Sequence, residues 1–139
     1  MKTFTLSTVG ESDSSLVEIP HHGYIAAGTP IEVIESNDTV TVAAHLVRGT
    51  MFALTIQGDS MVEDGYNDGD IIMVEERQTA NPGDTVVALI DREKATVKKY
   101  WPEGKNVRLK PANPDYPSIL YLAGRVQIQG IVRGLVRGY

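Results

Sequence analysis

A serine and a pair of lysines are the residues of this chain that could support covalent chemistry. Ser60 lies in Gln57-Gly58-Asp59-Ser60-Met61, directly after an apolar stretch that predicts a buried strand. At a strand end the serine can be held exposed, and the backbone N–H groups of Asp59 and Ser60 can face the oxygen of an incoming carbonyl. Taken alone, the Gly-Asp-Ser sequence favours an ordinary turn.

The two lysines are adjacent in the segment Ala95–Trp101. Alternation along a strand predicts that Lys98 shares a face with Thr96, while Lys99 shares the opposite face with Val97. One of the two ammonium groups must then point inward unless the strand lies at an edge. Burial can lower a lysine pKa by about 3–5 units, and the neutral amine can take a proton from a serine hydroxyl. The pattern does not choose between the lysines, and a solvated strand face is the ordinary alternative.

The elements that must position these residues are predicted to be strands. Short apolar runs separated by Gly, Asn, Asp and Pro turns, without a long amphipathic helix, indicate an all-β fold, a compact barrel or sandwich-like domain. The predicted strands are Met51–Gln57, Asp70–Glu75, Asp84–Ile90, Lys94–Trp101, Val107–Pro111 and Val126–Leu135.

The first third of the chain has a different character. Residues 1–15 are polar and are interpreted as a mobile arm. Residues 16–47 carry short apolar pieces broken by Pro20, Gly23, Gly28 and Pro30, which predict extended chain lying on the body rather than forming its core. We therefore divide the chain into an N-terminal arm, 1–47, and an all-β catalytic and dimerisation domain, 48–139.

Composition excludes several classes of function. The 139 residues carry a formal net charge of -5, which argues against direct DNA binding by this chain. The absence of cysteine excludes disulfides, thiolate nucleophiles and cysteine-ligated metals. No apolar run approaches the roughly 18 residues of a membrane span and no signal-peptide core is evident, so a cytoplasmic location is expected.

No metal or cofactor site is predicted. Residues 64–75 partly mimic a calcium-binding loop, but Tyr66 stands where a ligand is needed and no amphipathic helices flank the segment. A turn between strands is the favoured interpretation. His21, His22 and His45 lack a ligand spacing and are interpreted as solvated.

Several motifs together resemble one family. Gly58-Asp59-Ser60-Met61, Asp68-Gly69-Asp70, Gly83-Asp84 and Thr96-Val97-Lys98-Lys99 are similar, in order and spacing, to the self-cleaving serine–lysine peptidase domain shared by LexA and UmuD. The likeness extends over roughly residues 23–139. It implies that Ser60 is the nucleophile and selects Lys98, the lysine after Thr-Val, as the general base.

The resemblance also identifies a substrate within the chain. Ile25-Ala26-Ala27-Gly28-Thr29-Pro30 is similar to the self-cleavage segment of the family, which implies that the bond cut lies between Ala27 and Gly28. Small residues here would let the peptide enter a tight site, and Gly28 permits a bend. The stretches Pro111–Pro114 and Ile128–Gly130 resemble LexA more closely than UmuD.

The family further implies inducible self-cleavage in the SOS response to DNA damage. The expected partners are a RecA–single-stranded DNA filament and a second copy of the chain, paired through an edge strand at Val126–Leu135. The chain is then either a free-standing UmuD-like protein, which would engage a translesion polymerase subunit, or a LexA-like repressor lacking its DNA-binding domain.

Two other classes of function stay open. The chain could be a non-enzymatic dimerisation module of a transcriptional regulator, or a signal-peptidase-like protease acting in trans.

Overall fold

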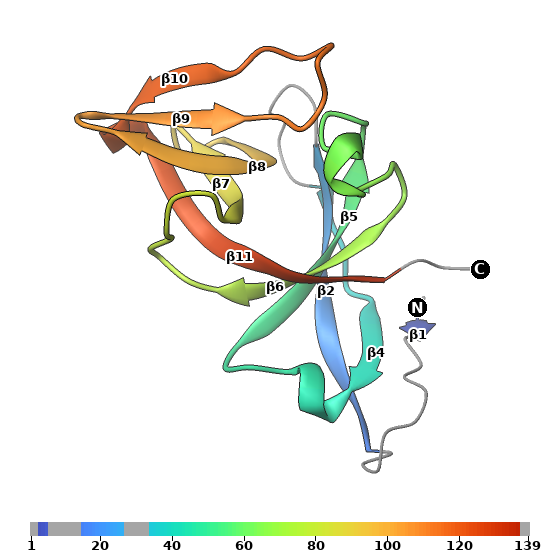
Figure 1. Cartoon of the computed structure of the whole chain (residues 1–139). Helices are drawn as coiled ribbons and strands as arrows, with labels where there is room; N and C mark the ends of the chain where they lie inside the picture. Colours follow the sequence, from blue (N-terminus) through green and yellow to red (C-terminus); the bar gives the residue numbers. More distant parts are fainter. Residues whose placement is uncertain (1–2, 6–14, 27–33, 137–139) are drawn as a thin grey trace.

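A computed structural model describes residues 3–5, 15–26 and 34–136, and the fold is all-β (Figure 1). Within these residues no α-helix occurs, and the non-strand elements include 3-10 turns at Ala44–Leu46, Val62–Asp64 and Ala123–Arg125. The strands are β1 (Thr3–Thr5), β2 (Leu16–Ala26), β3 (Ile34–Glu35), β4 (Thr39–Ala43), β5 (Met51–Gln57), β6 (Ile71–Glu76), β7 (Thr85–Ile90), β8 (Lys94–Glu103), β9 (Asn106–Lys110), β10 (Ile119–Leu122) and β11 (Val126–Val136).

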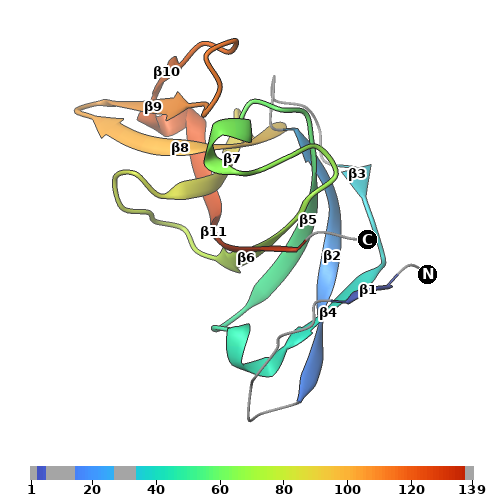
Figure 2. The ribbon, with the colours of Figure 1, turned by 45° about the vertical axis from the view of Figure 1, so that its right-hand side comes forward.

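The strands form one mixed sheet that curls into a partial ring. Their order is β1-β4-β2-β5-β6-β11-β7-β8-β9-β10, with β3 added beside β2. The path from β2 to β8 closes on itself because Ala26 of β2 pairs in parallel with Thr96 of β8. Strands β9 and β10 continue the sheet beyond β8, and β4 continues it beyond β2 (Figures 1 and 2).

Strands β5 and β6 are buried on both faces, which explains why both are continuous apolar runs. Alternation along β5 places Phe52, Leu54 and Ile56 in one core cluster, and Met51 and Ala53 in a second. The alternating residues of β6 divide between the same two clusters. A third cluster lies between β7 and β9.

The predicted all-β class is confirmed, and all six predicted strands occur with bounds that differ by at most two residues. The prediction for residues 16–26 is wrong, because β2 is a long strand whose Ile19 and Ile25 lie in the core. Pro20 and Gly23 resemble strand breakers, but they lie where β2 changes partner. It pairs with β4 up to Pro20 and with β5 from His21, with a register shift before Gly23.

Two further corrections concern strands. β4 and β10 were not predicted, although Val40 and Val42 alternate with threonines in β4 and are buried. β11 was predicted to be an edge strand, yet it lies between β6 and β7. The polar arm, residues 1–15, lies outside the described residues apart from Thr3–Thr5 and Ser15, and the division at residues 47 and 48 stays a prediction.

His21 also departs from its predicted solvated state. Its side chain is 1% exposed, and its ring nitrogens lie 2.9 Å from Ser36 Oγ and 2.7 Å from Thr55 Oγ1. Burial lowers the pKa of this imidazole. His21 is therefore a core residue that is satisfied by hydroxyl groups, whereas its neighbour His22 is exposed and stacks on Phe52.

Candidate active site

Ser60 follows the end of β5 and is fully buried, with 0% exposure, rather than exposed as a serine at a strand end can be. Gly58 begins the turn with a φ of 106°, a conformation that glycine adopts readily. The Gly58 N–H donates to Asp68 Oδ1 at 2.8 Å, and Met61 inserts its side chain into the main core cluster. The turn is therefore anchored on both sides of the serine.

Lys98 of β8 reaches this serine from across the ring. Its Nζ lies 3.0 Å from Ser60 Oγ, and it donates to Thr96 Oγ1 at 2.8 Å and to the Val97 carbonyl at 3.2 Å. The two latter atoms can accept the two N–H groups of a neutral amine, which leaves the lone pair able to face the serine hydroxyl.

Burial sets the proton affinity of Lys98. The side chain is 7% exposed, and desolvation lowers its pKa from 10.5 to about 7. Near neutral pH a substantial fraction of the amine is therefore unprotonated. The arrangement has the two parts of a general base and a nucleophile: a proton acceptor and a hydroxyl within hydrogen-bond distance.

Lys99 lies on the opposite side of the strand. Its side chain is partly exposed, and Nζ forms an ion pair with Asp64 Oδ2 at 3.3 Å. The structure therefore brings Lys98, and not Lys99, to Ser60. Alternation alone had left this choice open.

Of the predicted cleavage segment, residues 25–30, the structure describes Ile25 and Ala26, and Ala26 lies beside the site. β2 ends at Ala26, which is 5% exposed and pairs with Thr96, two residues before Lys98. Ala27 and Gly28 lie outside the described residues. The part of the chain that leads to them is therefore next to the strand that carries the lysine.

The proposed oxyanion donors are the backbone N–H groups of Asp59 and Ser60. Among the described residues, none accepts a hydrogen bond from either group. The carbonyl of Asp59 accepts from the Val62 N–H at 3.1 Å and from Asn113 Nδ2 at 2.9 Å.

Three residues stabilise this site although the sequence analysis gave them no role in it. Thr96 contacts Nζ of Lys98, Asp68 holds Gly58, and Asn113 holds Asp59. The strand alternation had placed Thr96 on the face of Lys98, which was a usable signal. Asn113 is 54 residues from Asp59 along the chain, so no local pattern could connect them.

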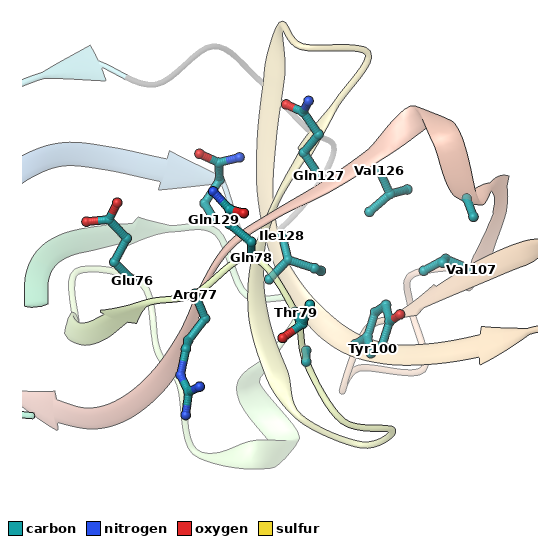
Figure 3. A pocket seen from close by; sticks show the side chains of 12 residues that line it. Glu76, Arg77, Gln78, Thr79, Tyr100, Val107, Val126, Gln127, Ile128 and Gln129 are labelled. Atoms are coloured by element: carbon teal, nitrogen blue, oxygen red, sulfur yellow. The ribbon is translucent and has the colours of Figure 1, made fainter. Parts of the chain in front are cut away.

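A separate pocket of about 680 Å³ contains none of the residues proposed for catalysis (Figure 3). It lies between residues 76–80, β8, β9 and the first half of β11, and Tyr100, Val107 and Ile128 line it.

Across the part of the chain that the structure covers, no helix has the length and apolar character needed to cross a bilayer.

Comparisons with known proteins identify the family of this chain and two of its relatives. The family described as Peptidase S24-like matches residues 20–133. The LexA repressor of Zymomonas mobilis is 46% identical over 133 residues, covering 95% of this chain and 61% of that protein. The LexA repressor of Erythrobacter litoralis is 41% identical over 140 residues, covering 100% of this chain and 60% of that protein.

The chain thus spans about three fifths of the length of these relatives. The family match covers most of the chain and includes the buried serine, the buried lysine and the strands that carry them. This chain belongs to the Peptidase S24-like family of serine peptidases.

Proposed function

We propose that this chain is a self-cleaving serine endopeptidase that cuts its own Ala27–Gly28 bond with Ser60 as nucleophile and Lys98 as general base. The observation that carries the proposal is the 3.0 Å distance between Lys98 Nζ and Ser60 Oγ, both on buried side chains. The lowered pKa of Lys98 supports it, because the amine can be neutral near pH 7. Family membership supports the class of chemistry.

The reaction proceeds in two stages. Lys98 takes the hydroxyl proton as Ser60 Oγ attacks the Ala27 carbonyl carbon, and the N–H groups of Asp59 and Ser60 stabilise the oxyanion. The bond to Gly28 breaks as Lys98 returns the proton to the leaving amine. Water then attacks the ester with Lys98 again as base, which leaves a carboxylate on Ala27 and frees Ser60.

The substrate is tethered through β2. The pairing of Ala26 with Thr96 supports attack within one chain, which benefits from a high effective molarity. Because the substrate is always attached, control of self-cleavage requires an equilibrium between docked and undocked states of the cleavage segment. A partner that binds the docked state more tightly speeds cutting.

The likeness to LexA repressors supports a role in the SOS response, with a RecA–single-stranded DNA filament as that partner, a homodimeric state and a cytoplasmic location. Within this proposal the chain acts either as part of a LexA-like repressor or as a UmuD-like protein that binds a translesion polymerase subunit. Addition of RecA filament is expected to raise the cleavage rate, and sedimentation should give a dimer mass. An unchanged rate would contradict the RecA filament as a partner, and a monomer mass would contradict the homodimer.

Incubation of the purified chain followed by intact-mass spectrometry tests the chemistry. The wild-type chain should yield fragments 1–27 and 28–139. Ser60→Ala and Lys98→Ala should stay intact, whereas Lys99→Ala is the matched lysine control and should still cut. A folded wild-type chain that never cuts contradicts the proposal and favours a non-enzymatic dimerisation module. Cleavage of added exported precursors would instead indicate a protease acting in trans.

A further inference from the structure

The loop between β9 and β10 is tied to the serine turn at several points. Asn113 Nδ2 donates to the Asp59 carbonyl at 2.9 Å, and the Tyr116 hydroxyl donates to Asp59 Oδ1 at 2.5 Å. The Glu63 N–H donates to the Ala112 carbonyl at 2.8 Å. This loop includes the Pro111–Pro114 stretch, to which the proposed reaction assigns no task. It therefore belongs to the framework of the active site.

Asn113 is held so that its amide nitrogen has a fixed direction. The side chain is 8% exposed, and its Oδ1 accepts the Asp115 N–H at 2.9 Å. The Asn113 carbonyl also accepts the Tyr116 N–H at 3.2 Å, which closes a turn over the same residues. With Oδ1 bound to a donor, Nδ2 is left to face the Asp59 carbonyl, as both hydrogen bonds require.

The carbonyl that Asn113 holds belongs to the same peptide group as the N–H of Ser60. This group is planar and trans, so its C=O and N–H point in opposite directions. A donor that fixes the Asp59 carbonyl therefore fixes the direction of the Ser60 N–H. The Val62 N–H, at 3.1 Å, holds the same carbonyl from within the turn, and Asn113 is the long-range tie.

We infer that Asn113 is a positioning residue that aims the backbone N–H of Ser60 at the oxyanion formed during cleavage. This inference rests on the proposed function. The hydrogen bond to the Asp59 carbonyl also polarises the shared peptide group, which strengthens its N–H as a donor. Among the printed contacts of the described residues, the Asn113 side chain bonds to Asp59 and Asp115, whereas Lys98 Nζ bonds to Ser60, Thr96 and Val97. Asn113 acts on the oxyanion alone and leaves the proton transfer to Lys98 unchanged.

The test is the pH profile of self-cleavage in the full chain. Asn113→Ala should lower the plateau rate by roughly ten- to a hundredfold, somewhat less than direct loss of an oxyanion donor, which costs about 10²–10³-fold. The pH midpoint should stay at the wild-type value because Lys98 sets it. Tyr116→Phe is the matched control: it removes the hydrogen bond to the Asp59 carboxylate but leaves the carbonyl contact, and it should cut at nearly the wild-type rate.

Asn113→Asp provides a second variant that keeps the shape and the turn to Asp115. It replaces the donor with an acceptor facing the Asp59 carbonyl, so it should be at least as slow as Asn113→Ala. Thermal unfolding of all variants identifies any that fail to fold.

Two results would overturn the inference while leaving the proposed function intact. The first is a folded Asn113→Ala or Asn113→Asp chain that cuts at the wild-type rate. The second is a slower Asn113→Ala chain whose pH midpoint has moved, because Asn113 would then act through Lys98. A folded wild-type chain that does not cut, or a Ser60→Ala chain that does, contradicts the proposed function, and the inference falls with it.

Discussion

Thr96 pairs with Ala26 across β8 and β2, and its hydroxyl lies 2.8 Å from Nζ of Lys98. One residue thus contacts both the strand that leads to the proposed scissile bond and the proposed base. Among the described residues, β2 and β8 pair at Ala26 and Thr96 alone, so the ring closes where the strand that leads to the proposed cleavage segment meets the strand of the proposed base. In the proposed reaction β2 is therefore both a strand of the fold and the segment that leads into the substrate.

The rate of self-cleavage should rise with pH through the pKa of Lys98, which burial lowers to about 7. Below that value the amine is protonated, and each further pH unit should lower the rate about tenfold; above it the rate should level off. Single-turnover cleavage measured between pH 5 and 10 gives the profile. Lys99→Ala should reproduce the profile, since Lys99 pairs with Asp64 away from the site. A rate equal at pH 5 and pH 9 would rule out a lysine base.

Thr96→Val should slow cleavage by about tenfold, an energy of roughly 1.4 kcal/mol, because the isosteric side chain no longer orients Nζ. Loss of an acceptor also disfavours the charged amine, so the midpoint of the pH profile should fall. The same single-turnover assay reports both quantities. Thr96→Ser keeps the hydroxyl and should retain the wild-type midpoint. If Thr96→Val matched the wild type in rate and midpoint, the hydrogen bond would have no part in orienting the base.

The strands that form the ring could be predicted where the sequence is continuously apolar. β5 and β6 are buried on both faces, so their apolar runs mark them without ambiguity. β2 was not predicted as a strand because Pro20 and Gly23 suggest breaks. These residues lie where the pairing partner of β2 changes from β4 to β5. A change of partner depends on residues distant in sequence and leaves no local pattern.

The site residues also divide into those that could be predicted from the sequence and those that could not. Ser60 and Lys98 could be selected because a family likeness supplied what alternation could not, namely which lysine is buried. Both faces of β8 are covered near this point, with Val97 in the main core cluster and Lys98 against Ser60. The role of Asn113 could not be predicted, since it depends on a contact between the β9–β10 loop and a turn after β5.

Gly130→Ala should destabilise the fold by about 1–3 kcal/mol, the usual cost of overpacking. A Cβ at this position would lie 2.6 Å from the backbone oxygen of Glu75 and would collide with Val74, on the neighbouring strand β6. Urea unfolding in a Ser60→Ala background measures the effect without self-cleavage. Gly124→Ala is the matched control, because a Cβ there meets no atom within 4 Å. Equal stability of both variants would contradict the close approach of β11 and β6.

Replacing Lys98 with Met should change how stability depends on pH. The folded pKa of Lys98, about 7, lies below the unfolded value near 10.4, so between these values the unfolded chain binds more protons and stability rises with pH. Below pH 7 the cost of burying the ammonium is fully present, up to about 5 kcal/mol for a difference of roughly 3.4 pKa units at about 1.36 kcal/mol each. Lys98→Met, compared by urea unfolding with its parent in a Ser60→Ala background, should remove this rise. The variant should therefore gain most over its parent below pH 7 and progressively less toward pH 10. A parallel pH dependence in the two proteins would mean that Lys98 is not desolvated in solution.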